Sequence, residues 1–275
     1  MNPGARWSIH GLAALWHTHR PMTPRVPTIE LLGVPLARLT PSEALNGIEQ
    51  LRATDAPVFL AYANAYTLNS AAGDPSYGDV LRRADLILND GKGVMLAARL
   101  LGDRFPADLN GNFFTPLLLR RAAERDWPVY LLGAKPGVAA AAADALAGSI
   151  PGLHVCGVHD GYFSGADLDG VIAGIRDSGA QVLLVALGNP AQERWLDAHL
   201  EKTGARIGIG VGAFFDFQTG TIPRAPTWMN RLGLEWVHRL ILEPRRMWRR
   251  YLLGNPLFLV RVLRSRFGRK SRKLR

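Results

Sequence analysis

Short apolar runs bounded by glycine alternate with helix-like segments along most of the chain, and this alternation limits the fold more than any other feature. The runs are apolar at nearly every position, which is typical of strands that a sheet buries on both faces. They predict an α/β fold: a Rossmann-like, mostly parallel sheet with helices on both faces. The predicted strands are Val58–Ala63, Leu86–Leu88, Val129–Leu132, His154–Val158, Val182–Leu187 and Arg206–Val211.

Helices are predicted between these strands, and a short β-hairpin around Gly33 is predicted at Thr28–Leu39. Ligands of such sheets bind beyond the carboxyl ends of the strands, so we expect functional residues in the loops that follow the strands. The predicted helices are Pro41–Arg52, Tyr66–Arg83, Gly93–Leu101, Phe113–Arg125, Val138–Ala147, Leu168–Arg176 and Ala191–Lys202.

Positive charge is concentrated in the last fifth of the chain. The net charge is +10, but residues 221–275 hold 15 Arg or Lys and two acids, so residues 1–220 carry about −3. This asymmetry predicts a polyanionic partner, either nucleic acid or anionic lipid. We divide the chain into a loose tail (1–27), an α/β domain (28–220), a basic helical appendage (221–267) and a disordered basic tail (268–275).

Targeting and redox signals are few. The stretch Ile9–Trp16 is short and has no convincing cleavage site, so residues 1–27 do not resemble a signal peptide. No run of 18 apolar residues is present, so no membrane-spanning helix is expected. The single cysteine, Cys156, excludes an internal disulfide and fits a reducing compartment.

Two interpretations of the basic segment remain open. Arginine interleaved with tryptophan can bind nucleic acid through phosphate contacts and stacking. Apolar faces with basic rims can instead lie on an anionic membrane surface. Prolines such as Pro244 and Pro256 predict short helices here, and Tyr251–Leu263 carries eight Leu, Phe and Val residues, which favours the membrane.

Asn89-Asp90-Gly91 stands between a predicted strand and a predicted helix. All three are common turn residues, so a structural turn is one interpretation. The other is a carboxylate at the mouth of the ligand crevice, where Asp90 would take a proton from an attacking hydroxyl group.

Three glycine-containing segments lie at the ends of predicted strands. In Leu187–Glu193, Pro190 begins a helix whose free N–H groups favour phosphate, although a well-formed βα turn explains the pattern equally. Leu132–Gly137 lacks the Lys-Ser/Thr ending of a P-loop. Gly208–Gly212 is not a proper dinucleotide fingerprint, so we expect a closely packed strand there and disfavour a soluble nucleotide-sugar enzyme such as an epimerase.

Candidate metal ligands have simpler explanations. Asp167-Leu168-Asp169 matches an Asp-x-Asp pattern that can hold a divalent ion, but it directly precedes an apolar helix pattern, which favours a helix N-cap. His154, Cys156 and His159 are close in sequence, but adjacent strand positions point to opposite faces, so we reject a zinc site. We predict no metal and no cofactor.

Taken together in this order, the motifs between Thr28 and Val262 resemble those of the WecG/TagA/CpsF family of glycosyltransferases, including its xanthan-type GumM branch. The resemblance rests on Asn64, Asp90-Gly91, Asn110-Gly111, Gly133 with Gly137, Gly161-Tyr162-Phe163, Gly188-Asn189-Pro190-Ala191-Gln192-Glu193, Gly210-Val211-Gly212-Ala213-Phe214, Arg224-Ala225-Pro226, Glu235-Trp236, Arg239-Leu240 and Glu243-Pro244-Arg245-Arg246.

The resemblance implies that residues 28–220 form a catalytic domain and that residues 221–267 dock it on a membrane. It implies an inverting, metal-independent transfer of a hexose from a UDP-sugar to a polyprenyl (undecaprenyl) diphosphate-linked sugar. The implied setting is exopolysaccharide or cell-surface polysaccharide synthesis, peripheral to the cytoplasmic face of the bacterial inner membrane. A homo-oligomer is compatible with this setting, and nucleic acid is not expected as a partner.

The resemblance also implies roles for single residues. Asp90 falls at the family's proposed catalytic base, and the appendage arginines are expected to meet a diphosphate. The implied substrate-binding residues are Tyr62, Asn64, Gly91, Asn110, Gly111, Gly133, Gly188, Gln192, Glu193, Arg239, Arg246 and Arg249.

Two departures from the family pattern bear on the sugar. Tyr62 stands where many members have Thr, and Phe113 stands where a common Gly-Ser/Thr-Asp motif has its Asp. Leu109-Asn110-Gly111 leans toward the GumM branch, which implies a β-1,4-glucosyl transfer. Transfer of N-acetylmannosamine or N-acetylmannosaminuronic acid, as in TagA or WecG, is the alternative. A nucleic-acid-binding protein with a basic arm is the non-enzyme alternative.

Overall fold

The computed structural model describes residues 26–223, 225–226, 229 and 234–273. The antiparallel strands β1 (Thr28–Leu31) and β2 (Val34–Ala37) come first, joined by Leu32 and Gly33 at positive φ. This confirms the predicted hairpin, in which glycine readily adopts the left-handed turn. The predicted loose tail, residues 1–27, lies almost entirely outside the described residues.

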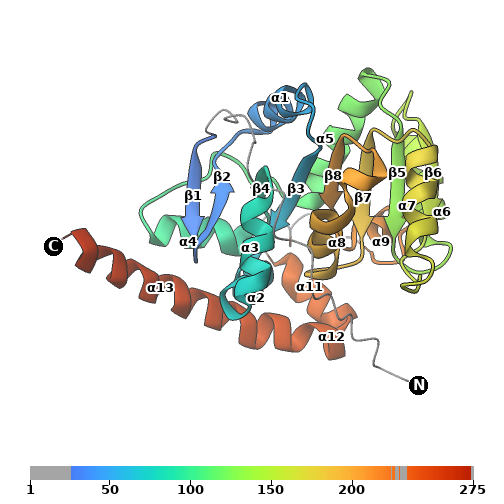
Figure 1. The fold of residues 1–275 in the computed structure, drawn as a ribbon. Coiled ribbons are helices and arrows are strands. Elements are labelled where there is room, and N and C mark those ends of the chain that lie inside the picture. The colour runs from blue at the N-terminus through green and yellow to red at the C-terminus, as the bar shows by residue number, and fades with distance from the viewer. Residues whose placement is uncertain (1–25, 224, 227–228, 230–233, 274–275) are drawn as a thin grey trace.

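A six-stranded parallel sheet forms the centre of the protein, in the order β4-β3-β8-β7-β5-β6. All six predicted strands are present, so the Rossmann-like α/β prediction is confirmed. Strands β3 and β8, the first and last of this sheet in the chain, are neighbours in it, and β8 lies between β3 and β7 (Figure 1). The strands are β3 (Val58–Ala63), β4 (Leu86–Asn89), β5 (Val129–Gly133), β6 (Val155–His159), β7 (Val182–Ala186) and β8 (Ile207–Gly210).

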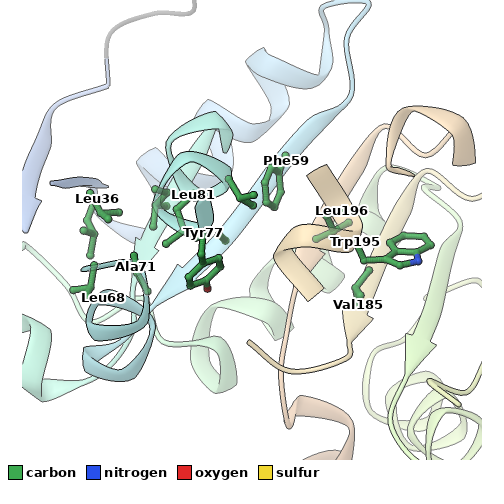
Figure 2. Packing of buried hydrophobic residues seen from close by; sticks show 14 of the residues in the cluster. Leu36, Phe59, Leu68, Ala71, Tyr77, Leu81, Val185, Trp195 and Leu196 are labelled. Atoms are coloured by element: carbon green, nitrogen blue, oxygen red, sulfur yellow. The ribbon is translucent and has the colours of Figure 1, made fainter. Parts of the chain in front are cut away.

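Helices cover both faces of the sheet, because successive strand side chains point to opposite faces. On one face Phe59 and Ala61 pack with residues of α2, α3 and α8 (Figure 2). On the other, Leu60 and Tyr62 pack with α1, α5, α6 and α9. The helices are α1 (Pro41–Arg52), α2 (Ala65–Gly73), α3 (Pro75–Arg83), α4 (Lys92–Leu100), α5 (Gly111–Glu124), α6 (Val138–Ser149), α7 (Leu168–Asp177), α8 (Ala191–His199), the short 3-10 turn η1 (Glu201–Thr203) and α9 (Phe214–Gln218).

The single helix predicted at Tyr66–Arg83 is two helices, because Asp74-Pro75 interrupts it. Pro75 has no N–H to donate to the preceding turn. Asp74 accepts a hydrogen bond from the Tyr77 N–H at 3.3 Å and so caps α3.

The C-terminal segment comprises α11 (Glu235–Leu242), α12 (Pro244–Trp248), the π-helical turn η2 (Arg249–Leu253) and α13 (Gly254–Lys273). It runs past the carboxyl ends of the strands, on the side to which the arrowheads of β3, β7 and β5 point (Figure 1). Phe258 and Val262 of α13 are 1% and 0% exposed and belong to the same core as α2 and α4. This half of α13 is therefore an integral part of the folded body.

The prediction of short helices holds for α11 and α12 but is wrong for α13, which spans 20 residues. Pro256 is the third residue of α13, and proline is tolerated in the first turn of a helix. The structure describes α13 as far as Lys273, and the division into an appendage and a disordered tail from Gly268 stays a prediction. None of the described helices is long and apolar enough to span a bilayer.

Candidate active site

Asp90 follows β4 directly, and Asn64 follows the neighbouring strand β3. The Asn64 Nδ2 group donates to Asp90 Oδ2 at 3.0 Å. At the same time Asn64 Oδ1 accepts from the N–H groups of Tyr66 and Thr67 at 3.0 and 3.1 Å, so Asn64 is the N-cap of α2. One side chain thus joins Asp90 to the first turn of α2.

The N-termini of two further helices, α4 and α5, lie near the Asp90 carboxylate. Gly91, at φ 93°, is the N-cap of α4, and its N–H donates to Asp108 Oδ1 at 3.1 Å. Gly111 is the first residue of α5, and its backbone N–H hydrogen-bonds the Asp90 carboxylate. The N-termini of α2, α4 and α5 therefore converge on Asp90, and their partial positive charges favour an anion there.

The ionisation of Asp90 is set by opposing influences. Burial raises its pKa above the ordinary value, and the charge of Asp108 acts in the same direction. The hydrogen bonds from Asn64 and Gly111 and the charge of Arg250 oppose this rise in pKa. A carboxylate whose pKa is raised is a stronger general base than an ordinary aspartate. A simple turn does not require these contacts, and the catalytic role of Asp90 stays a prediction.

The C-terminal segment faces the same carboxylate. Burial raises the pKa of Glu235 in α11 and of Tyr251 in η2, and the charge of Asp90 contributes to both rises. The charges of Arg239 and Arg250 lower the pKa of Tyr251. Residues of the C-terminal segment thus share one electrostatic environment with Asp90.

The three predicted diphosphate arginines differ in their surroundings. Arg239 is only 14% exposed in its side chain, donates to Glu243 Oε2 at 3.0 Å and lies over the Phe217 ring. Arg249 is exposed and lies over the ring of Trp248, its neighbour in the chain. The side chain of Arg246 lies outside the described part of the structure. Their contact with a diphosphate stays a prediction.

Tyr62 packs behind the site and is almost fully buried, and the substrate contact predicted for it stays a prediction. The residue is 5% exposed, and its hydroxyl lies 3.0 Å from Thr115 Oγ1 in α5. Its ring packs close to Gly111, at 3.5 Å from where a Cβ would stand. Asn110 caps the same helix, with its Oδ1 accepting from the N–H of the exposed Phe113 at 3.1 Å.

Gln192 is buried and joins two loops at the carboxyl edge of the sheet. Its Oε1 accepts from the N–H of Gly188 at 3.2 Å, after β7, and from the N–H of Gly212 at 3.0 Å, after β8. Its Nε2 donates to Glu193 Oε1 at 2.7 Å. The Gly188 N–H is therefore engaged within the protein, so the phosphate contact that the loop pattern allowed is not available from this group.

Glu193 lies at the centre of a buried polar network and is 0% exposed. Asn189 Nδ2 donates to its Oε1 at 2.6 Å, and the Tyr77 hydroxyl donates to its Oε2 at 3.1 Å. Burial raises the pKa of Glu193 to about 7. Both side chains hold loops in place in this structure, and the substrate contact predicted for Gln192 and Glu193 stays a prediction.

Gly133 is also buried by neighbouring backbone. It has φ 126°, and a Cβ there would stand 2.5 Å from the Ala186 carbonyl oxygen, so glycine is required for β5 and β7 to approach this closely. Nearby, the Gly161 N–H donates to the Ala134 carbonyl at 2.9 Å. The next residue, Tyr162, is 71% exposed.

Asp167 occupies the N-cap position of α7, as predicted, but not with the expected contact. Its Oδ2 accepts from the N–H and hydroxyl of Ser164 at 3.1 and 2.7 Å instead of from the helix. The preceding turn therefore competes successfully for the carboxylate.

Sequence reasoning did not assign Asp108, Tyr66, Arg250 or Tyr251 to this site. Tyr66 and Arg250 belong to segments far apart in the chain, and only the packing of α2 against the C-terminal segment brings them together. A possible signal was the pair Arg250-Tyr251, but its helical phase depends on the π-helical turn η2, which the sequence does not reveal.

Comparison with known proteins identifies the family. A sequence profile of the glycosyl transferase WecG/TagA/CpsF family matches residues 29–272. Two similar proteins are both named N-acetylglucosaminyldiphosphoundecaprenol N-acetyl-beta-D-mannosaminyltransferase. The one from Bacillus subtilis (strain 168) is 34% identical over 202 residues, covering 74% of this chain and 77% of its own length. The one from Bacillus spizizenii is 32% identical over 206 residues, covering 75% and 79%. The chain therefore belongs to the WecG/TagA/CpsF family of glycosyltransferases.

Proposed function

We propose that the protein transfers N-acetylmannosamine from UDP-N-acetylmannosamine to the N-acetylglucosamine of undecaprenyl-diphosphate-N-acetylglucosamine. Family membership supports the reaction class, and the printed names of both relatives support this donor and acceptor. The relatives thus favour the N-acetylmannosaminyl alternative over the β-1,4-glucosyl transfer that the sequence suggested first. The structural observation that carries the proposal is Asp90, a carboxylate of raised pKa at the convergence of three helix N-termini.

Asp90 is the proposed general base. It accepts the proton of the acceptor hydroxyl as that oxygen forms a bond to the anomeric carbon of the donor. In the same displacement the bond between the anomeric carbon and the UDP oxygen breaks, and UDP leaves with the electron pair. A single displacement inverts the configuration, so an α-linked donor yields a β-linked product.

Negative charge develops on the departing UDP, and positive groups around Asp90 are suited to stabilise it. The helix N-termini supply partial charges, and arginines of the C-terminal segment supply full ones. We propose a metal-independent reaction, since the Asp167 carboxylate is engaged by Ser164. Transfer should then persist in EDTA, whereas a loss that Mg²⁺ or Mn²⁺ restores would overturn this part of the proposal.

The acceptor lipid stays in the bilayer while its sugar reaches Asp90, so the enzyme must lie on the membrane. Leu253, Leu257 and Val260 are exposed at a spacing of four and three residues, which places them on one side of the C-terminal helix. Arg264 and Arg266 follow them and are exposed. We propose that this apolar and basic side rests on anionic lipid, at the cytoplasmic face of the bacterial inner membrane.

The test is a panel of UDP-sugars offered with a short-chain, water-soluble acceptor carrying N-acetylglucosamine on a diphosphate. Mass spectrometry should show addition of one N-acetylhexosamine from UDP-N-acetylmannosamine, and Asp90→Asn should serve as the inactive control. Transfer from UDP-glucose alone would restore the glucosyl interpretation. Absence of transfer from every donor, with specific retention of DNA or RNA at matched salt, would favour the nucleic-acid alternative.

A further inference from the structure

We propose that Arg250, which makes cation–π contacts with Tyr66 and Tyr251, is a diphosphate-binding residue of this enzyme. The inference rests on the proposed function, because it names a further residue for the same transfer. It differs from the family resemblance, which implied Arg239, Arg246 and Arg249 and gave no role to Arg250.

Arg250 makes cation–π contacts with two tyrosine rings. Its Cζ lies 4.6 Å from the centre of the Tyr66 ring in α2 and 5.8 Å from that of the Tyr251 ring in η2. A cation–π contact attracts the guanidinium to a ring without using its five N–H donors in hydrogen bonds to oxygen. The two rings therefore help to position Arg250 without engaging a hydrogen-bond acceptor.

The Arg250 side chain makes no hydrogen bond and no ion pair within the described part of the chain. Its charge acts on Asp90 through space, without a direct contact between the two groups. Arg239, by contrast, is already paired with Glu243. A fixed guanidinium with free donors matches the paired oxygens of a diphosphate, which accept two parallel N–H bonds.

The backbone that follows Arg250 is held against α2. Arg250 lies in the π-helical turn η2, and such turns occur frequently at functional sites. Just after this turn, the Gly254 carbonyl accepts from Asn69 Nδ2 at 2.7 Å. Arg261 donates to the Asn69 backbone oxygen at 2.9 Å. Tyr66 and Asn69 are one turn apart on α2, whose N-cap is the Asp90 partner Asn64, so one helix positions both Arg250 and Asp90.

Two diphosphates are candidates, because the donor carries one between uridine and sugar and the acceptor carries one between sugar and lipid. Arg250→Gln, Arg250→Lys and the control Arg120→Gln should be compared with the wild-type enzyme on the soluble acceptor. The quantities to measure are kcat, the KM for each substrate, and UDP affinity by calorimetry. Arg120 is exposed on α5, so its replacement removes one positive charge away from the site and should leave all four quantities unchanged.

We expect Arg250→Gln to lower kcat/KM by about 10- to 100-fold, the usual effect of losing one charge-assisted bidentate contact. A raised KM for UDP-sugar together with weaker UDP binding would assign the donor diphosphate. A raised acceptor KM with unchanged UDP binding would assign the acceptor diphosphate. Arg250→Lys should recover only part of the loss, because an ammonium group cannot bind bidentately.

Tyr66 variants separate substrate binding from a structural role. Tyr66→Phe keeps the ring and should behave as wild type, whereas Tyr66→Leu should reproduce the kinetic signature of Arg250→Gln. Combined, Tyr66→Leu and Arg250→Gln should cost little more than Arg250→Gln alone, since they disrupt one unit. Variants that lower only the melting temperature, with every KM at the wild-type value, would overturn the proposal. Failure of the wild-type enzyme to transfer any sugar would instead overturn the proposed function.

Discussion

The Asn64 side chain donates to Asp90 at 3.0 Å from the N-cap of α2, and its orientation is fixed by the helix itself. Its Oδ1 accepts from two N–H groups of the first turn, so only Nδ2 is free to meet the carboxylate. The ionisation of Asp90 is therefore tied to the position of α2, on which the C-terminal helix α13 also packs.

Asp90→Asn should lower kcat by about 10²–10⁴-fold, the usual cost of losing a general base. The substitution keeps the shape of the side chain and removes its basicity, so affinity for the UDP-sugar should be largely retained. Steady-state kinetics on the soluble acceptor and calorimetry with UDP measure the two effects separately. A folded variant with near-normal turnover would show that Asp90 is not the base.

Asn64→Ser should move the acidic limb of the pH–rate profile toward higher pH. Asp90 must be ionised to accept a proton, so activity falls as the pH drops through its pKa. The Asn64 hydrogen bond lowers that pKa, and its removal should raise the pKa further. Serine can still cap α2, which limits the loss of stability. Thr40→Ser at the cap of α1 is the control and should leave the profile unchanged; equal profiles for Asn64→Ser and wild type would contradict the role of Asn64.

The fold could be predicted from sequence largely because its strands are strongly patterned. Val58–Ala63 and Val182–Ala186 are apolar at nearly every position and bounded by turn residues, so the apolar pattern alone indicated strands of a buried parallel sheet. The C-terminal segment was harder. Its proline at Pro256 suggested an interruption, but a proline in the first turn of a helix breaks no hydrogen bond.

Some residues of the candidate site could be located from the sequence and others could not. The positions of Asp90 and Asn64 at the carboxyl ends of strands could be predicted, because each residue directly follows a predicted strand. The structural roles of Tyr62, Gln192 and Glu193 could not, because a residue that contacts substrate and one that holds a loop occupy similar positions in the sequence. The contacts of Gln192 with Gly188 and Gly212 show that it holds loops. Arg250 was missed because its direction depends on the π-helical turn η2.

Glu193→Gln should flatten the dependence of stability on pH. Unfolded Glu has a pKa of about 4.3, whereas burial raises that of Glu193 to about 7. Between these values the folded protein keeps a proton that the unfolded chain has lost, so the unfolding free energy falls as pH rises, by up to about 4 kcal/mol.

Glutamine carries no charge and still offers an oxygen to Asn189 and Gln192. Its amide can donate to the Tyr77 hydroxyl, so the network survives. Melting temperatures at pH 5 and pH 8 should differ less for Glu193→Gln than for wild type. Glu124→Gln, on the exposed side of α5, should keep the wild-type difference. The same pH difference in Glu193→Gln and wild type would show that Glu193 does not titrate on unfolding.

The last prediction separates membrane attachment from catalysis. Truncation of α13 cannot do this, because Phe258 and Val262 are buried in the core that α13 shares with α2. Replacement of Leu253, Leu257 and Val260 by serine changes only exposed side chains, of which Leu253 is 59% exposed. Burial of one such side chain in an apolar phase contributes about 1.5–3 kcal/mol, so the triple variant should lose most of its flotation with anionic vesicles.

Transfer to the short-chain, water-soluble acceptor should remain near the wild-type rate in the triple variant, since Asp90 and Arg250 are unchanged. Val158→Ser, which removes an exposed apolar side chain from β6 at the far edge of the sheet, is the matched control and should float as wild type does. If the triple variant still floats, α13 does not hold the enzyme on the membrane. If it floats poorly and also loses turnover on the soluble acceptor, this side of α13 contributes to the active site as well as to attachment.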